Sequence, residues 1–429
     1  MNSGKVYCDS IYSTIAWPSR SIIFFFFTIM SFFAHKNTEL LFAKACEKHS
    51  QLDFTSAEQI YLELLELLPE SSMVHYNAGL LYYETEDYER ALLHFAAARS
   101  YAPRDPDVLF NLALCQKKTG RFREAILSFT EFSTKFQEDP DGFYNLGNCH
   151  RELKEFEETI AAYLQVLKLN RDHMPAMKNL AYVYHLQGDC ANSITLYRDI
   201  LTLEPDNSQV RHMLASLTGV HSDQAPHEYI EGVFDSYSDT FETNLLEDLH
   251  YSVPADLRAG ADIFIQYGKA FNKGIDLGCG TGLAGLEFHE LCDHLTGVDI
   301  SSKMVEKAKS KNIYNILEVA EVTFFLKTKR NLYDLIIAAD LLTYLGDLEP
   351  IFKAVTAATT DKSFFCFSTE NGGRADYQLL TTGRFAHLRK YVVETARKYG
   401  WSCLDISDSR LRKEKNDWVQ GTLYFMEKL

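Results

Sequence analysis

A period of 34 residues runs through the first half of the chain and constrains its fold more than any other feature. Pro69 and Pro103 are one period apart, and Pro205 falls on the same phase. Segments starting at Thr38, Ser72, Pro106, Pro140 and Met174 align on this period. Their eighth position is small (Ala45, Gly79, Ala113, Gly147, Ala181), their twentieth is small (Ala57, Ala91, Ala125, Thr159, Ser193), and their twenty-fourth is aromatic (Tyr61, Phe95, Phe129, Tyr163, Tyr197).

Small residues at fixed positions let two antiparallel helices approach closely, and an aromatic residue can fill the gap to the next hairpin. Residues 38–207 are therefore predicted to form five helical hairpins stacked into an α-helical solenoid. The pattern resembles tetratricopeptide repeats, which have the same period. The resemblance implies a concave groove that binds a protein or peptide partner.

The sixth position of each repeat is expected to face this groove. It is Asn77, Asn111, Asn145 and Asn179 in four repeats and Ala43 in the first. An amide side chain both donates and accepts hydrogen bonds, so it can pair with a peptide backbone of any sequence. A similar asparagine ladder lines the repeats of the O-linked N-acetylglucosamine transferases. The alternative is that asparagine is simply common at this position.

Basic residues also lie near the predicted groove, at Lys117, Lys118, Arg151 and Lys178. They favour an acidic peptide or a C-terminal carboxylate, or else form a solvated face. For the chain as a whole, a net charge of −16 argues against nucleic acid as the main partner. The nine cysteines are scattered without a CxxC pair, which suits a reducing cytoplasm and predicts neither disulfides nor a metal site.

Residues 1–37 need a separate interpretation because 22–34 form an apolar run. The run is shorter than the roughly 20 residues that span a bilayer, and no small-residue cleavage pattern follows it. We expect Met30 to be the true start, so that the leader is not translated. The alternative is a secretion or anchoring signal.

Residues 208–227 are predicted to be a linker, and residues 228–429 alternate apolar strand-like runs with helical segments. That alternation predicts a parallel α/β sheet of the Rossmann-like type. Within it, a strand from Gly274 ends in three glycines, Gly278, Gly280 and Gly282, and a helix begins near Leu283. Glycines let the loop backbone lie against a ligand at the carboxyl edge of the sheet. Asp299 ends the next strand, where its carboxylate can accept from both hydroxyls of a ribose.

Two cofactor classes share this layout, a dinucleotide and S-adenosylmethionine. A dinucleotide fingerprint needs a glycine where this chain has Leu283, and Asp276 would repel a pyrophosphate. S-adenosylmethionine has no phosphate and carries a cationic amino group and a sulfonium. The sign of the charge therefore favours the methyl donor.

Residues 228–429 resemble the seven-stranded class I methyltransferases. The resemblance assigns Asp276 and the loop Gly278, Cys279, Gly280, Thr281 and Gly282 to the methionine and ribose portions of S-adenosylmethionine. It assigns Asp299 and Ile300 to the ribose, and Glu321 to the adenine amino group, where the family often has aspartate. Asp340 to Tyr344 would follow the fourth strand, beside the methyl group.

A bacterial group of predicted methyltransferases containing tetratricopeptide repeats resembles the chain more closely still. Shared segments are Phe234 to Tyr251, Gly383 to His387 and Leu411 to Glu414. Tyr237 to Phe241 is a plausible lid that excludes water, and Tyr237 is a candidate cofactor contact.

Three residues are candidates for chemistry at the acceptor: His387 as a base, with Tyr344 and Asp340 at the acceptor site. For His387 the alternative is a packed or capping histidine. Arg384, Arg412 and Lys413 would meet an acidic acceptor or only solvate the rim. No Asn-Pro-Pro-Tyr type of motif follows the fourth strand, which lowers the expectation of nucleobase or glutamine-amide targets.

Three functions remain open. The first is a protein methyltransferase whose groove captures the substrate. The second is a methyltransferase for a small or carrier-bound acceptor, whose repeats recruit a partner enzyme. The third is a repeat scaffold whose cofactor domain no longer catalyses.

Overall fold

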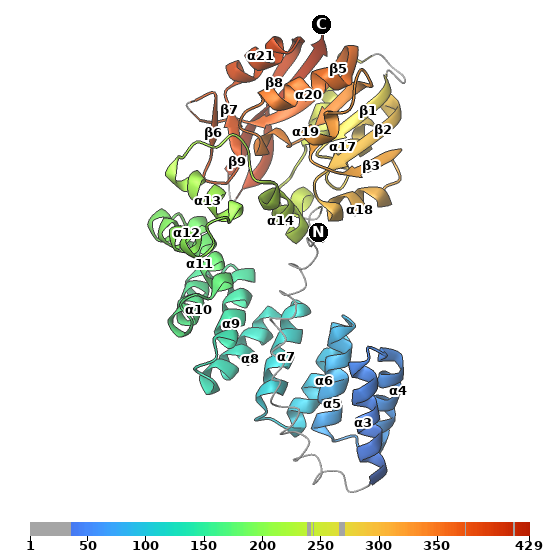
Figure 1. Ribbon diagram of the computed structural model, residues 1–429, viewed down its shortest axis with the longest axis vertical. Coiled ribbons are helices and arrows are strands. Elements are labelled where there is room, and N and C mark those ends of the chain that lie inside the picture. Colours follow the sequence, from blue (N-terminus) through green and yellow to red (C-terminus); the bar gives the residue numbers. More distant parts are fainter. Residues whose placement is uncertain (1–35, 238–241, 243, 266–270, 374, 415–416) are drawn as a thin grey trace. The chain divides into compact units, whose positions relative to one another are not determined.

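The computed structural model of the chain describes residues 36–237, 242, 244–265, 271–373, 375–414 and 417–429 (Figure 1). The predicted leader up to residue 35, including Met30, lies outside these residues. The chain divides into two compact units, one ending at Leu196 and one beginning at Tyr197. Within the described parts of the chain, none of the helices has the length and apolar character needed to cross a membrane.

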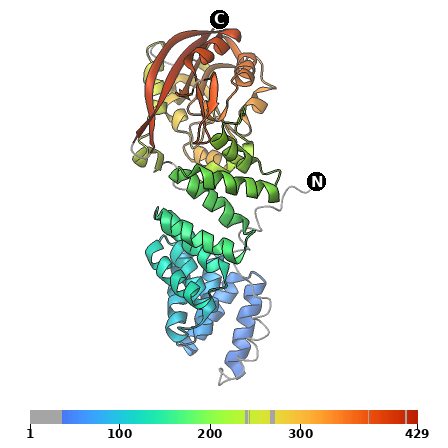
Figure 2. The same ribbon diagram turned by 90° about the vertical axis from the view of Figure 1, so that its left-hand side faces the viewer.

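Helices stacked in antiparallel pairs make up the first unit (Figures 1 and 2). The pairs are α3 (Lys36–Ser50) with α4 (Phe54–Leu67), α5 (Ser72–Glu84) with α6 (Tyr88–Tyr101), α7 (Pro106–Lys118) with α8 (Phe122–Lys135), α9 (Pro140–Glu152) with α10 (Phe156–Leu169), and α11 (Met174–Gln187) with the start of α12 (Cys190–Leu203). Helix α12 continues past Leu196, the last residue of the first unit. Four of the pairs begin at the residues where the period predicts a repeat to start. Aspartate or serine side chains cap several of these helices, such as Asp53 before α4 and Asp87 before α6, and a proline follows the cap of α7 and α9.

Glycine at the eighth position makes room for the aromatic ring of the same repeat. A Cβ atom on Gly79 would lie 2.8 Å from the ring of Phe95, and one on Gly147 would lie 2.7 Å from the ring of Tyr163. Both rings are fully buried. The aromatic residue therefore packs inside its own hairpin, whereas the sequence pattern had suggested a role toward the next repeat.

A nine-stranded sheet forms the centre of the second unit. Its strands are β1 (Phe271–Leu277), β2 (Cys292–Asp299), β3 (Ile316–Val319), β4 (Tyr333–Ala338), β5 (Thr359–Glu370), β6 (Tyr377–Leu379), β7 (Phe385–His387), β8 (Trp401–Glu414) and β9 (Asp417–Lys428). Strands β3-β2-β1-β4-β5 run parallel in that order, and β9 pairs antiparallel with β5 and with β8. This is the Rossmann-like order that the sequence predicted, with a short hairpin β6–β7 added at the end of β5.

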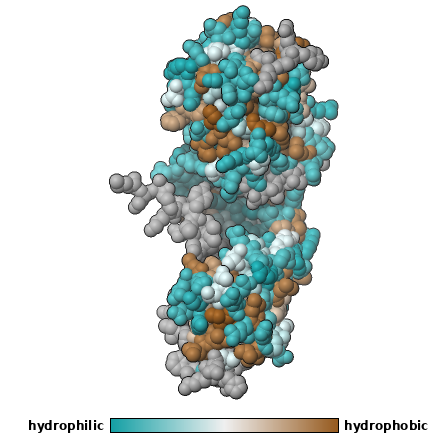
Figure 3. Space-filling view, turned by 90° about the vertical axis from the view of Figure 1, so that its right-hand side faces the viewer, coloured by the Kyte–Doolittle hydropathy of each residue, from teal (hydrophilic) through white to brown (hydrophobic). Residues whose placement is uncertain are grey.

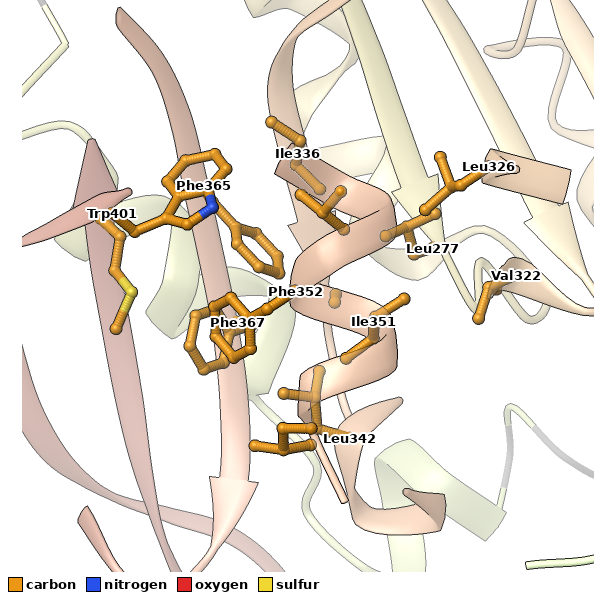
Figure 4. Packing of buried hydrophobic residues seen from close by; sticks show 14 of the residues in the cluster. Leu277, Val322, Leu326, Ile336, Leu342, Ile351, Phe352, Phe365, Phe367 and Trp401 are labelled. Atoms are coloured by element: carbon orange, nitrogen blue, oxygen red, sulfur yellow. The ribbon is translucent and has the colours of Figure 1, made fainter. Parts of the chain in front are cut away.

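Both faces of the sheet are covered, which explains why β4 reads as a continuous apolar run. Ile336 packs in a cluster with α19 (Val322–Leu326), α20 (Glu349–Ala358) and α21 (Arg389–Lys398), where Phe352 and Trp401 are buried (Figure 4). Its neighbours Leu335 and Ile337 point to the other face, under α16 (Val253–Ala261) and α17 (Leu283–Phe288). Because strands β3, β2, β1, β4 and β5 are parallel, their carboxyl ends lie at one edge of the sheet, where ligands bind in such sheets.

The sheet ends at β3, where apolar side chains reach the surface. Ile316 and Val319 are each 52% exposed, and Phe324 of α19 is 68% exposed. Figure 3 shows hydrophobic residues scattered among hydrophilic ones on the face of this unit that it displays.

The segment predicted to be a linker is part of the second unit. It contains α13 (Ser208–Thr218), whose buried His212 lies with Nε2 2.8 Å from the carbonyl oxygen of Gly383 in the β6–β7 turn. Further along, the Ala225 amide donates to the carbonyl oxygen of Tyr344 (2.9 Å), and the Gly346 amide donates to that of Asp223 (2.8 Å). Residues 208–227 are therefore held by side-chain and backbone hydrogen bonds.

Candidate active site

The glycine loop after β1 has a backbone that only glycine adopts easily. Gly278, Gly280 and Gly282 have φ angles of 69°, 52° and 94°. The Gly278 amide donates to the carbonyl oxygen of Val298 at the end of β2 (2.8 Å), which fixes the loop against the neighbouring strand. A Cβ atom on Gly280 would meet nothing within 4 Å among the described residues. An open space therefore borders the loop backbone at Gly280.

Asp299 is held rigidly beside this loop. Its Oδ2 accepts from the Gly280 amide (2.8 Å), and its Oδ1 accepts from the Ser301 amide (2.9 Å). Burial raises the pKa of the Asp299 carboxyl, while these backbone hydrogen bonds act in the opposite direction. The sequence motif of glycines followed by an aspartate at the end of the next strand is thus one connected structure.

Asp276, in β1, is fully buried and is bound by a tyrosine that the sequence analysis did not single out. The hydroxyl of Tyr314 donates to Asp276 Oδ2 (2.7 Å), while Asp276 Oδ1 is buried without a partner among the described residues. A Cβ atom on Gly285 would come within 2.2 Å of the Tyr314 hydroxyl oxygen, so glycine there makes this contact possible. Burial raises the pKa of Asp276 to about 7.

Glu321 and Ile300, the other predicted cofactor contacts, lie on the same edge. Ile300 directly follows Asp299 and precedes α18 (Ser302–Ser310). Glu321 caps α19, because its carboxylate accepts from the amides of Thr323 (2.8 Å) and Phe324 (2.6 Å). A carboxylate has about four lone-pair sites, so this capping leaves acceptor capacity.

Helix α14 (His227–Tyr237) contacts the chain that follows β2 and the chain that follows β4. Ser301 donates through Oγ to Asp235 Oδ1 (2.6 Å), and the ring of Phe234 lies 5.5 Å from that of Tyr344. The side chain of Tyr237 and residues 238–241, the predicted lid, lie outside the described part of the structure. Beyond them, Lys311 forms an ion pair with Glu242, next to Gly282.

Asp340 follows β4 at the place where the sequence predicted an acceptor residue. Its φ angle is 56°, an uncommon left-handed conformation for aspartate. Its Oδ2 accepts from Arg412 Nη1 (2.7 Å), and its Oδ1 accepts from the hydroxyl of Ser368 (3.1 Å). Tyr344 lies one short turn later, in η3 (Leu342–Tyr344).

The two predicted arginines are both bound to carboxylates. Arg384 donates through Nε to Glu370 (2.6 Å), and Arg412 donates through Nε to Glu414 (3.0 Å). A second nitrogen of Arg384 binds Glu414, and a second nitrogen of Arg412 binds Glu370. The guanidinium of Arg412 is 7% exposed and the carboxylate of Glu370 is 2% exposed. They form a buried network and not a solvated rim.

His387, the predicted base, is enclosed on β7. It is 1% exposed, and its Nε2 lies 2.8 Å from the carbonyl oxygen of Leu345 and 3.1 Å from that of Gly346. Burial lowers its pKa to about 4, so the ring is neutral at physiological pH. These contacts favour a histidine that holds the loop after Tyr344 over one that takes a proton from a ligand.

Family comparisons assign both halves of the chain. The family described as "Methyltransferase domain" matches residues 275–365, which run from the end of β1 into β5 and include the glycine loop, Asp299 and Asp340. Families described as "Tetratricopeptide repeat" match residues 42–108, 82–141 and 140–173. The chain carries tetratricopeptide repeats and a class I methyltransferase domain. A sequence search of curated proteins found no match to it.

Solved structures resemble one half or the other. A tetratricopeptide repeat protein from Parabacteroides merdae is 16% identical, with a TM-score of 0.41, over 47% of this chain and 79% of that one. YrrB, described as a TPR protein with an unusual peptide-binding site, is 19% identical, with a TM-score of 0.38, over 40% of this chain and 89% of that one. A putative S-adenosylmethionine dependent methyltransferase from Listeria monocytogenes is 15% identical, with a TM-score of 0.33, over 41% and 99%. We draw no conclusion about ligands from these similarities.

The asparagines of the tetratricopeptide repeats lie on the first helix of their pairs. Asn77, Asn111 and Asn145 each donate through Nδ2 to the carbonyl oxygen four residues earlier, at 2.8–2.9 Å. Asn179 donates to Asn148 Oδ1 (3.2 Å). Lys117 donates to Asn145 Oδ1 (2.5 Å), so the Asn145 oxygen already has a partner. Each asparagine of the predicted ladder therefore donates at least one hydrogen bond inside the repeats, and the oxygen of Asn145 is engaged as well.

The sequence analysis missed one residue at the edge of the methyltransferase domain, Tyr314, and assigned no role to another, Tyr251. Tyr314 lies in the loop before β3, 38 positions from the Asp276 that it binds, and no local motif marks it. Tyr251 precedes α16, and the adjoining chain is held to β8 because the Lys413 amide donates to the carbonyl oxygen of Leu249 (2.7 Å). This hydrogen bond brings Tyr251 beside Arg412, and the spacing of the two residues in the sequence does not predict that they are neighbours.

Proposed function

We propose that the methyltransferase domain transfers the methyl group of S-adenosylmethionine to an acceptor, and that the tetratricopeptide repeats hold a protein substrate or partner. The observation that carries the proposal is the clamped Asp299 beside the open space at Gly280. Both Asp299 oxygens are fixed by backbone amides, so the carboxylate needs no reorganisation to accept from two ribose hydroxyls.

The residues present fit this cofactor. A Cβ atom on Gly280 would extend into the open space, so a glycine at this position leaves that space free for the cofactor. Asp276 Oδ1 is buried without a hydrogen-bond partner among the described residues, and a cationic amino group with its bound water is the kind of ligand that satisfies it. A phosphate would instead face Asp276 and Asp299.

Alignment of the reactants is the chief task of the protein. The cofactor supplies an electrophilic methyl group on a sulfonium. Asp299 and Glu321 would orient its ribose and adenine, and the glycine loop would follow its methionine portion. Asp340 and Tyr344, at the end of β4, would border the acceptor. Phe234 of α14 packs on Tyr344 and helps to close this edge against water.

Methyl transfer from labelled S-adenosylmethionine into an extract of the host, divided into protein and small-molecule fractions, tests the proposal. We expect label in the protein fraction, dependent on the repeats. Asp299→Ala should abolish transfer. Asp408→Ala is the matched control, because the Asp408 carboxylate is 72% exposed and pairs only with Arg389 among the described residues. It should leave transfer unchanged.

Each other outcome has a definite meaning. Label confined to small molecules would make the repeats a recruitment module. Transfer that persists in the Asp299→Ala variant would contradict the proposed cofactor site. Binding of S-adenosylmethionine without any transfer would leave a scaffold whose cofactor domain does not catalyse.

A further inference from the structure

Five charged side chains meet at the acceptor edge, and they do not balance. Arg384 and Arg412 carry two positive charges, and Asp340, Glu370 and Glu414 carry three negative ones. The guanidinium of Arg412 binds all three carboxylates, and that of Arg384 binds two of them. Counted over the described residues, the network therefore has one negative charge in excess, at a place where burial limits screening by solvent.

This excess decides the charge of a ligand that binds beside the network. A carboxylate or phosphate acceptor would be a fourth anion against two cations that already serve protein carboxylates. An ammonium group would bring the count to three of each sign. Acidic acceptors, for which Arg384 and Arg412 were candidates from the sequence, are thus disfavoured by the partners that these arginines have.

Two tyrosines add hydrogen-bonding capacity at the same place. Tyr344 follows Asp340 in η3, and Tyr251 is held next to Arg412 by the backbone hydrogen bond between Lys413 and Leu249. Tyr251 lies close enough to Asp340, Arg412 and Tyr344 to interact with them electrostatically. Neither hydroxyl has a hydrogen-bond partner among the residues that the structure describes. Burial raises the pKa of both phenols, so both stay protonated at physiological pH.

We propose, on the basis of the methyl transfer proposed above, that the acceptor is an amine held by the hydroxyl oxygens of Tyr251 and Tyr344 and by the carboxylate of Asp340. The amine enters as an ammonium ion, whose N–H groups match these three acceptors. The positive sulfonium beside it then favours loss of one proton, which passes to Asp340.

The reaction balances with these groups alone. The nitrogen lone pair forms a bond to the methyl carbon while the carbon–sulfur bond breaks, and that electron pair stays on sulfur as a neutral thioether. The product is a methylated ammonium, and Asp340 returns its proton to solvent when the product leaves. Tyr251 and Tyr344 orient the lone pair and do not exchange protons.

The labelled extract also tests this acceptor assignment, because methyl esters and methylamines differ in stability. Mild alkali releases the methyl of an ester as volatile methanol and leaves an N-methyl group in place. We expect alkali-stable label that mass spectrometry locates on nitrogen. Tyr344→Phe and Tyr251→Phe should each lower the rate about tenfold or more, as for loss of one oriented hydrogen bond, with the Kd of S-adenosylmethionine within about twofold of wild type. Tyr399→Phe, whose hydroxyl binds Glu349 on the outer face, is the matched control.

Two results would overturn the assignment: label released by alkali, or a Tyr251→Phe, Tyr344→Phe double variant that transfers methyl at the wild-type rate. A wild-type protein that transfers no label to any fraction would instead count against the proposed function, on which the assignment rests. The variants keep the phenyl rings, so the packing of Tyr344 on Phe234 is preserved and loss of folding is not expected to mimic loss of the hydroxyl.

Discussion

Buried carboxyl groups are the residue-scale feature that sets this domain apart from an ordinary α/β sheet. Asp276, Asp299 and Glu370 are each at most 8% exposed. Backbone amides stabilise the carboxylate of Asp299 and arginines that of Glu370, whereas Asp276 Oδ1 has no hydrogen-bond partner among the residues that the structure describes. An incompletely satisfied buried carboxyl destabilises its ionised form, so Asp276 is the group whose titration should affect stability most directly.

Asp276→Asn should therefore change the pH dependence of stability. The Asp276 carboxyl has a pKa of about 7 in the folded chain and about 3.9 in an unfolded one. Between these values only the folded chain keeps the proton, so the free energy of unfolding falls as pH rises from about 4 to 7. An amide cannot ionise and can still accept from Tyr314. We expect the variant to be more stable than wild type at pH 8, by up to about 4 kcal/mol, and to converge with it near pH 4.

The measurement is the Tm of the second unit in both proteins between pH 4 and pH 8, without S-adenosylmethionine. A difference in Tm that stays constant over this range would show that Asp276 is ionised in the folded chain throughout.

The sequence predicted those site residues that lie in one continuous motif. The glycine loop and Asp299 are separated by a single strand–helix–strand unit, so spacing alone places them together. Asp340 and Arg412 are 72 positions apart, and their ion pair depends on the pairing of β8 with β9, which in turn pairs with β5. The periodicity of the sequence predicts neither the register of these strands nor the burial of their side chains. For that reason the sequence analysis could interpret Arg412 as a rim residue and His387 as a base.

At the scale of elements, α13 and the chain that follows it belong with the methyltransferase domain. Helix α13 contacts the β6–β7 turn through His212, and residues 223–225 pair with the chain around Tyr344. Apolar residues of these segments, Ala215 and Ala225, pack with Phe385 and Leu379 of the hairpin. The 34-residue period ends before this region, and without it the sequence had no pattern from which to predict the packing.

Three fragments test this assignment. A fragment of residues 197–429 should unfold cooperatively, whereas 228–429 should have a lower Tm or aggregate, because it exposes Phe385 and leaves the carbonyl oxygen of Tyr344 without its partner. A third fragment, 219–429, keeps residues 223–225 but lacks α13, and we expect an intermediate Tm. Equal Tm values for the first two fragments, measured by circular dichroism, would make residues 208–227 a passive linker.

On the scale of the whole molecule, the chain joins a repeat array to a methyltransferase domain. The order of helices and strands in each part follows from a simple pattern in the sequence. Repeats were predicted from the 34-residue period, and the parallel sheet from the alternation of strands and helices. What the array binds depends on side-chain hydrogen bonding that periodicity does not give. Each asparagine of the ladder already donates at least one hydrogen bond within the repeats, so only its remaining donor and acceptor capacity is left for a bound peptide.

The most direct test of the account is a calorimetric titration of S-adenosylmethionine into the full chain, its Gly280→Ala variant and its Gly120→Ala variant. Gly280 and Gly120 both have positive φ angles, 52° and 73°, and a Cβ atom at either would meet nothing within 4 Å among the described residues. The two substitutions therefore carry similar backbone strain of about 1 kcal/mol, but only Gly280 borders Asp299. The account predicts one binding site in wild type and in Gly120→Ala, and no detectable binding in Gly280→Ala. Equal affinity in all three proteins, or no binding to the wild-type chain, would contradict it.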